Sequence, residues 1–271
     1  MRFRLGFALL TTMVIGTGAA SADDSELYET QAVVTGTGET NRQLGFEECF
    51  RDVLVKVSGD QRLLADPRVA AALPTSGDLV ASFRYRDRLE GIPIHDEQGS
   101  YDRPHDLTCT FDRAKVDAVL AGLGSTPWLA ERPRLILFLA VERGDQRFML
   151  ARDGDESPYM RESLLGAAAP LAMEVDVPDR QELLAAELDA TSLWNAAQDG
   201  LGDVARRSGG DAPMAGRLAW SDADRGWVAD WQLASDGAHY GWQIRGVSFD
   251  DAFRNAMSGA LQILSGNGPP K

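Results

Sequence analysis

The sequence is poor in the residues that carry most side-chain catalysis. Only two of its 271 residues are cysteine and only three are histidine. The familiar patterns G-x-S-x-G, S-x-x-K, H-E-x-x-H and C-x-x-C are missing, and so is a Walker loop. We therefore expect no catalytic residues, no bound metal and no cofactor. These absences favour a protein that is not an enzyme.

Basic residues are also scarce. The chain has 27 lysine and arginine residues against 41 aspartate and glutamate residues, for a net charge of -14. A chain this acidic is repelled by phosphate backbones, and no basic cluster offsets the repulsion. Nucleic acid is therefore excluded as an expected partner.

Long apolar runs are missing except at the N-terminus. Arg2 and Arg4 precede the apolar run LGFALLTTMVIG, which is shorter than the ~20 residues that a membrane span needs. Small residues follow at Ala20 and Ala22. This pattern predicts a signal peptide over residues 1–22, cleaved after Ala22, and an exported mature chain without a membrane span. A retained N-terminal anchor helix is the alternative.

The two cysteines, Cys49 and Cys109, both lie in the part predicted to be exported. An even number of cysteines in an oxidising compartment favours a disulfide. In the chain-entropy model, closing a loop of about 60 residues stabilises a fold by about 4 kcal/mol. The alternative is two buried free thiols, and a nucleophilic cysteine is the weakest interpretation.

Residues 23–127 are predicted to form an N-terminal α/β domain. A strand in LYETQAVVTGTG leads to a helix over 41–57, where Thr40 and Gln43 have the spacing of a capping box. Apolar residues in that helix recur every three or four positions. A strand from LVASFRYRDRLEGIPI, in which Phe83 and Arg84 point to opposite sides, a short strand LTCTF and a helix after Asp112 complete the domain.

Residues 128–265 are predicted to form a second α/β domain. Prolines bracket the joint STPWLAERP, and the apolar run RLILFLAVE that follows is typical of a strand buried on both faces. We expect a helix near 158–169, a strand LAMEVDV, helices within 179–208, a tryptophan-rich antiparallel meander over 214–247 and a helix over 248–264. The predicted fold class is α/β (α+β), with two small mixed-sheet domains, helices packed on the sheets, and a disordered tail over 266–271.

The densest cluster of reactive residue types is the stretch HDEQGSYDRPHDLTC, residues 95–109. Imidazole and carboxylate groups suit zinc or manganese, but their spacing here fits no metal template. The stretch is open to three interpretations: a structural loop pinned by charge pairs among Asp96, Arg103 and Asp106, a recognition loop, or a metal or catalytic site. The candidate recognition residues are His95, Asp96, Glu97, Asp102, Arg103, His105 and Asp106.

Several stretches together resemble a known bacterial family. They are VLVKVSGD, DEQGSYDRPHDLTCTFD, PWLAERPRLILFLAVE and the later pair GRLAW and WVADWQL. In these stretches the chain resembles the family called domain of unknown function 2066 (DUF2066). The resemblance implies an exported envelope protein of Gram-negative bacteria and implies no catalytic residues.

Three functions remain open from the sequence. The first is a non-enzymatic periplasmic protein that contacts an envelope protein partner. The second is a metal-dependent hydrolase that uses His95, Asp96, Glu97 and His105. The third is a carrier that binds a small ligand between the two domains, which requires a pocket with convergent polar groups. No sequence feature indicates a particular oligomeric state.

Overall fold

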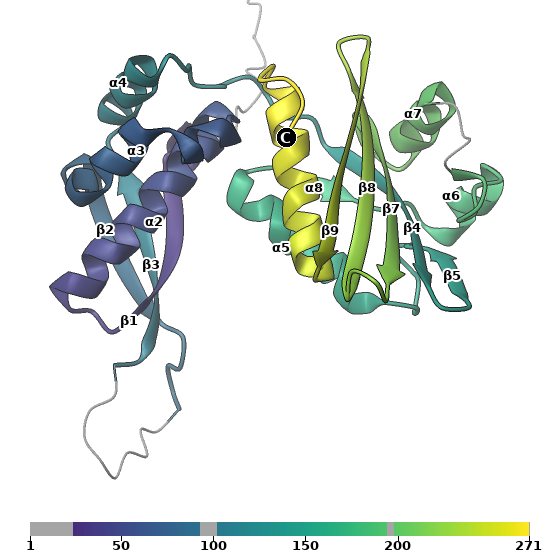
Figure 1. Ribbon diagram of the computed structural model, residues 1–271, viewed down its shortest axis with the longest axis horizontal. Helices are drawn as coiled ribbons and strands as arrows, with labels where there is room; N and C mark the ends of the chain where they lie inside the picture. The colour runs from purple at the N-terminus through teal and green to yellow at the C-terminus, as the bar shows by residue number, and fades with distance from the viewer. Residues whose placement is uncertain (1–23, 93–101, 194–197, 271) are drawn as a thin grey trace, which may run out of the picture.

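The computed structural model describes residues 24–92, 102–193 and 198–270. Within these ranges the chain is a mixed α+β protein with one sheet of three strands and one of six. Figure 1 shows the two sheets side by side, with helices α5 and α8 between them. The predicted fold class is confirmed, although only the second sheet is mixed, because every strand pair of the first sheet is antiparallel.

The first sheet has the strand order β1-β3-β2 and is covered on one face by the long helix α2. A buried cluster lies between them, built around Phe50, Leu54 and Leu107. Its elements, in chain order, are α1 (Asp24–Leu27), β1 (Glu29–Thr35), α2 (Glu39–Ser58), the 3-10 helix η1 (Gln61–Ala65), α3 (Pro67–Ala72), η2 (Leu73–Leu79), β2 (Val80–Asp87), β3 (Pro104–Phe111) and α4 (Arg113–Leu123).

The second sheet has the order β5-β4-β7-β8-β9, and β6 pairs with β4. In Figure 1, α5 and α8 lie on the side that faces the first sheet, and α6 and α7 lie on the other. The elements are β4 (Leu135–Arg143), β5 (Gln146–Met149), α5 (Pro158–Ala168), η3 (Ala169–Leu171), β6 (Val175–Asp176), α6 (Arg180–Ala185), α7 (Gln198–Arg207), β7 (Ala212–Ser221), β8 (Gly226–Ser235), β9 (Ala238–Val247) and α8 (Phe249–Leu264).

The tryptophans of the meander are core residues except at one end. Trp227, Trp231 and Trp242 are buried beneath α8, whereas Trp220 is partly exposed. Gly216 gives the ring of Trp231 its space, because a Cβ atom at this position would lie 2.4 Å from that ring. The aromatic side chains therefore fill the space between sheet and helix.

Some local predictions were wrong. The start of α2 has Gly38 as its N-cap with no side-chain cap, so Thr40 and Gln43 form no capping box. Gln43 instead donates to the main-chain oxygen of Leu73 at 3.1 Å. The predicted strand LAMEVDV pairs only over β6, and the hairpin strand β5 was not predicted.

The two halves of the chain contact each other at the C-terminal end of α2. Val55 of α2 belongs to the core beneath the second sheet, whereas its neighbour Leu54 belongs to the first core. Asn267, in the segment expected to be a disordered tail, donates to the main-chain oxygen of Ser58 at 2.9 Å. The end of α2 is thus shared by both domains. The domain bounds themselves stay a prediction.

Candidate functional site

The polar stretch 95–109 is only partly a loop. His95, Asp96 and Glu97 lie outside the described residues. Strand β3 begins at Pro104, three residues before the strand predicted from LTCTF, so the second half of the stretch is a strand.

Asp102 and Arg103 lie where the hairpin between β2 and β3 enters β3. Arg103 Nη1 contacts Asp87 Oδ2 at 3.1 Å, and Arg103 Nη2 donates to the main-chain oxygen of Ile92 at 3.0 Å. The carboxyl of Asp102 lies against Gly36, where an added Cβ atom would be 2.7 Å from it. Both side chains therefore shape the hairpin and its contact with the end of β1.

His105 and Asp106 point to opposite faces of β3, because neighbouring residues of a strand alternate. Asp106 is buried and accepts from Arg86 Nε at 3.0 Å. His105 Nδ1 lies 2.8 Å from the main-chain oxygen of Arg103, and its ring meets Tyr85 edge to face. The expected pairing of Arg103 with Asp106 does not form, because each pairs with a residue of β2 instead.

These residues do not converge on a metal. Over the three described ranges, no group of three or more histidine, cysteine, aspartate or glutamate residues is placed to hold an ion. The described residues of the stretch thus stabilise the hairpin, and their role in recognition stays a prediction.

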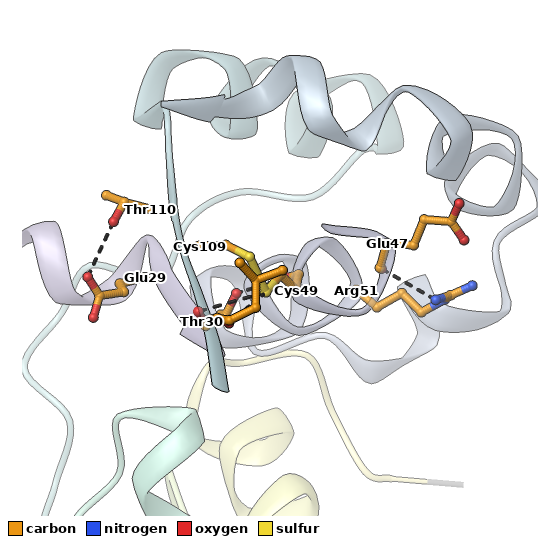
Figure 2. The surroundings of a disulfide bond; sticks show 8 residues. Glu29, Thr30, Glu47, Cys49, Arg51, Cys109 and Thr110 are labelled. Atoms are coloured by element: carbon orange, nitrogen blue, oxygen red, sulfur yellow. Dashed lines mark hydrogen bonds between the residues drawn. A yellow bond between two sulfur atoms is a disulfide. The ribbon is translucent and has the colours of Figure 1, made fainter. Parts of the chain in front are cut away.

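Cys49 and Cys109 form a disulfide that links α2 to β3. Both residues are fully buried. Figure 2 shows Thr30 beside the bridge, where its hydroxyl donates to the main-chain oxygen of Cys49 at 3.0 Å. The disulfide lies inside the first core and is a structural bond.

A hollow, which we call the main hollow, lies between the two domains. It has a volume of about 550 Å³, and an adjoining hollow of about 420 Å³ shares part of its lining. We call the two together the interdomain cleft. One wall comes from β1, β2, β3, α2 and η1, and the other from α5, η3 and α8. The main hollow is lined by Gln31, Asp52, Val55, Gln61, Leu64, Ser163, Gly166, Ala167, Pro170, Leu171, Asp250, Arg254 and Ser258.

Arg132, in the segment between the domains, fixes one end of the cleft. Its guanidinium donates to the main-chain oxygens of Lys56 and Leu171 and lies 5.0 Å from the ring centre of Trp128. Burial lowers the pKa of Arg132 to about 10, and the side chain remains a cation at neutral pH. Because Lys56 and Leu171 belong to opposite domains, Arg132 holds the walls together at this end.

Asp52 carries the most unusual electrostatics of the cleft. Its side chain is open to solvent in the cleft, yet the protein around it removes part of its hydration. This partial desolvation, together with the nearby charge of Glu48, raises the pKa of Asp52 to about 6, against a smaller opposing effect of Arg51. The carboxyl therefore changes charge close to physiological pH.

Lys56 lines the adjoining hollow but is already engaged. The residue is buried, and its ammonium donates to the main-chain oxygens of Glu26 at 2.7 Å and Glu29 at 2.8 Å. Burial lowers its pKa, and so does the charge of Arg132. Lys56 thus connects α2 to α1 and to the first residue of β1.

The opposite wall presents a second carboxyl. Asp250, in the first turn of α8, accepts from the hydroxyl of Ser163 on α5. Arg254 also lines the cleft, but its guanidinium contacts Asp251 at 2.6 Å. Carboxyl groups of both domains therefore face one cleft that also has apolar walls.

Sequence reasoning did not identify this site. Asp52 belongs to the polar side of an amphipathic helix, where a charged residue is ordinarily solvated. Its neighbours across the cleft, such as Asp250 and Ser258, come from the far end of the chain. The sequence implies that a ligand between the two domains requires a pocket, but it does not indicate the residues that line one.

Residues 21–129 match the family model described as Domain of unknown function (DUF8605). The matched region begins two residues before and ends two residues after the predicted N-terminal domain, 23–127. No curated protein and no solved structure matches the chain.

This match corrects the resemblance to DUF2066, which was wrong. The stretches behind that resemblance include the end of α2, the entry into β3 and the buried strand β4. Burial imposes similar apolar runs on unrelated α/β proteins, so short stretches of this kind do not separate families.

Proposed function

We propose that the protein is exported to the periplasm and acts there as a non-enzymatic binding protein whose ligand occupies the interdomain cleft. The observation that carries the proposal is the cleft itself, in which both domains supply apolar wall and polar groups. Ligand sites of proteins occur preferentially at such domain interfaces, with a few polar groups on a largely apolar lining.

Export is supported by the pattern of the first 22 residues: two arginines, a short apolar run and small residues before the predicted cleavage after Ala22. A disulfide between Cys49 and Cys109 suits the same compartment, because disulfides persist where the environment is oxidising. In the described part of the chain, no helix has both the length and the apolarity that crossing a membrane requires.

A binding role is supported by what surrounds the cleft carboxyls. Catalysis by a carboxylate pair or a nucleophile requires partners that activate each other. Ser163 faces Asp250, and no histidine is found among the described residues that line the cleft. This chemistry suits holding a ligand, and it is compatible with a ligand that is part of an envelope protein.

Gly166 of α5 offers a direct test. It lines both hollows, and a Cβ atom at this position would meet nothing within 4 Å, so the side chain of Gly166→Leu starts in open space and extends into the cleft. Gly122 of α4 is the matched control, because it also lies near the end of a helix with open space around it and lines neither hollow.

The wild type, Gly166→Leu and Gly122→Leu would each be purified from the periplasm. The compounds that they release on denaturation would be identified by mass spectrometry. We expect the wild type and Gly122→Leu to release the same bound compound and Gly166→Leu to release none. Release of the same compound in the same amount from Gly166→Leu would show that the cleft is not the site.

A further inference from the structure

The N-terminal wall of the interdomain cleft includes an unpaired sheet edge. The order β1-β3-β2 gives β1 one strand neighbour, β3, within the described residues. In Figure 1, β1 is the strand of the first sheet that lies nearest to the second domain. Glu29, Thr30 and Gln31 of this strand line the adjoining hollow. An edge of this kind presents main-chain donors and acceptors to any chain that enters the cleft.

Contacts at the two ends of β1 identify which residues face the open edge. The main-chain oxygen of Glu29 accepts from Lys56 Nζ, and that of Thr35 accepts from Asn41 Nδ2. In an antiparallel pair, alternate residues direct both main-chain groups toward the partner strand or away from it. Gln31 and Val33 belong to the same alternate set as Glu29 and Thr35. Their N–H and C=O groups therefore point to the open edge, where no side chain of the described residues bonds them.

The wall opposite β1 includes small residues. Gly166 has no side chain, and Ala167 and Pro170 are small apolar neighbours on the same wall. A strand lying along β1 would therefore pass between its edge and α5, with alternate side chains directed into the main hollow.

The charge in the cleft selects the kind of side chain that enters. Arg84 is neutralised by a bidentate pair with Glu29, at 2.9 and 3.0 Å, and Arg254 is paired with Asp251. Lys56 is occupied by two main-chain oxygens. Asp52 and Asp250 have no cation within salt-bridge distance among the described residues, and the whole chain carries a net charge of -14. A basic ligand is thus attracted both at long range and inside the cleft.

We propose that the cleft binds an extended peptide, which adds a strand to β1 at Gln31 and Val33 and directs a lysine or arginine side chain toward Asp52 and Asp250. This inference rests on the proposed function and names the ligand class of the same site. Strand addition supplies affinity through main-chain hydrogen bonds, and the side-chain hollow supplies specificity. A small organic cation without a peptide backbone is the alternative that the test must separate.

The probe is a fluorescein-labelled capped peptide of alternating threonine and valine with one central lysine. Its binding to the full-length exported protein is measured by fluorescence polarisation. A peptide with glutamate in place of the lysine is the charge control. We expect the lysine peptide to bind at least about tenfold more tightly than the glutamate peptide, with the difference decreasing as salt is added. Equal binding of the two peptides, or no binding of either, would overturn the inference.

Two variants of Gln31 separate the main chain from the side chain. Gln31→Pro removes the N–H on the open edge and leaves the ladder to β3 intact, which is where a strand tolerates proline. Gln31→Thr removes the amide side chain and keeps the N–H. We expect about tenfold weaker binding of the lysine peptide to Gln31→Pro and little change for Gln31→Thr. Equal losses in both variants would exclude strand addition.

N-methylated peptides repeat this test without altering the protein. An added strand bonds β1 through one alternate set of its N–H groups. Methylation of that set abolishes binding, and methylation of the other set leaves it unchanged. If both methylated peptides bind equally, the ligand does not pair with β1.

The outcomes also separate this inference from the proposed function. If the wild type releases a compound that is not a peptide and Gly166→Leu releases none, the cleft remains the binding site, and the inference that its ligand is a peptide is overturned. If Gly166→Leu releases as much of the compound as the wild type and also binds the lysine peptide as tightly, both the proposed function and the peptide inference are overturned.

Discussion

Arg132 donates a hydrogen bond to the main-chain oxygen of Lys56 and so connects the segment between the domains to the end of α2. The same guanidinium reaches the main-chain oxygen of Leu171 in the second domain. Trp128, next to it, donates its main-chain N–H to Val57 at 2.8 Å. One partly buried cation therefore sets the distance between the cleft walls at their joined end.

Arg132→Ala should lower the free energy of unfolding by about 2 kcal/mol, because hydrogen bonds from a charged donor contribute about 1.5–3 kcal/mol. Arg132→Lys should recover only part of this loss, since an ammonium lacks the planar fork that reaches two oxygens while stacking on Trp128. Urea unfolding followed by tryptophan fluorescence measures both.

The control is Arg206→Ala on α7, whose pair with Asp203 is exposed on both sides. Exposed pairs of this kind contribute less than about 1 kcal/mol. Equal losses at Arg132 and Arg206 would show that Arg132 does not join the domains.

Elements in which apolar residues recur at a regular spacing were predictable from the sequence. The apolar face of α2, the caps of α4 at Asp112 and Gly124, and the start of α8 at Ser248 all agree with the structure. The alternation predicted for Phe83 and Arg84 continues along β2, where Arg86 contacts Asp106 and Tyr85 contacts His105. Local periodicity suffices here because a single element determines each feature.

Features that depend on tertiary pairing were not predictable. Strand β5 is short, and β6 pairs over only Val175 and Asp176, so neither has enough residues for a clear pattern. Gln43 has the spacing of a capping residue, but its side-chain amide donates instead to the main-chain oxygen of Leu73. Gln31 and Ser258 both line the cleft, and no local sequence pattern connects residues so far apart in the chain.

The disulfide should contribute about 3–4 kcal/mol to the free energy of unfolding, since it closes a loop of 60 residues. We expect Cys49→Ala combined with Cys109→Ala to unfold at lower urea concentration than the wild type. Addition of a thiol reductant to the unfolding series should lower the midpoint of the wild type and leave that of the double variant unchanged. A wild-type midpoint that does not respond to reductant would mean that the two thiols are not bonded in solution.

Gly216 should be intolerant of a side chain. A Cβ atom there would lie 2.4 Å from the ring of Trp231 and 2.9 Å from Leu139. Overpacking of a core costs about 1–3 kcal/mol, so Gly216→Ala should lower the free energy of unfolding by that amount. The same change at Gly122, which meets nothing within 4 Å, should not lower it. Trp231→Phe should reduce the cost of Gly216→Ala in a double-mutant cycle, and purely additive effects would contradict the contact.

Asp52 should make the stability of the protein depend on pH in a defined direction. Its pKa is about 6 in the folded protein, where partial desolvation and the charge of Glu48 outweigh the charge of Arg51, and about 3.9 for aspartate in an unfolded chain. Between these values the folded protein holds a proton that the unfolded chain releases. The contribution of Asp52 is therefore fully present below about pH 4 and is lost as the pH rises through about 6.

Asp52→Asn lacks this titration, so its melting temperature should rise relative to that of the wild type between about pH 4 and pH 7. The control is a carboxyl whose pKa is shifted in the opposite direction: Arg68 lowers the pKa of Asp66, so Asp66→Asn should lose stability relative to the wild type as the pH rises through about 4.

Binding of the lysine peptide should strengthen over the same pH range in which Asp52 becomes charged, and Asp52→Asn should remove that pH dependence. A melting-temperature difference between Asp52→Asn and the wild type that stays constant with pH would show that the cleft leaves the proton affinity of Asp52 unchanged.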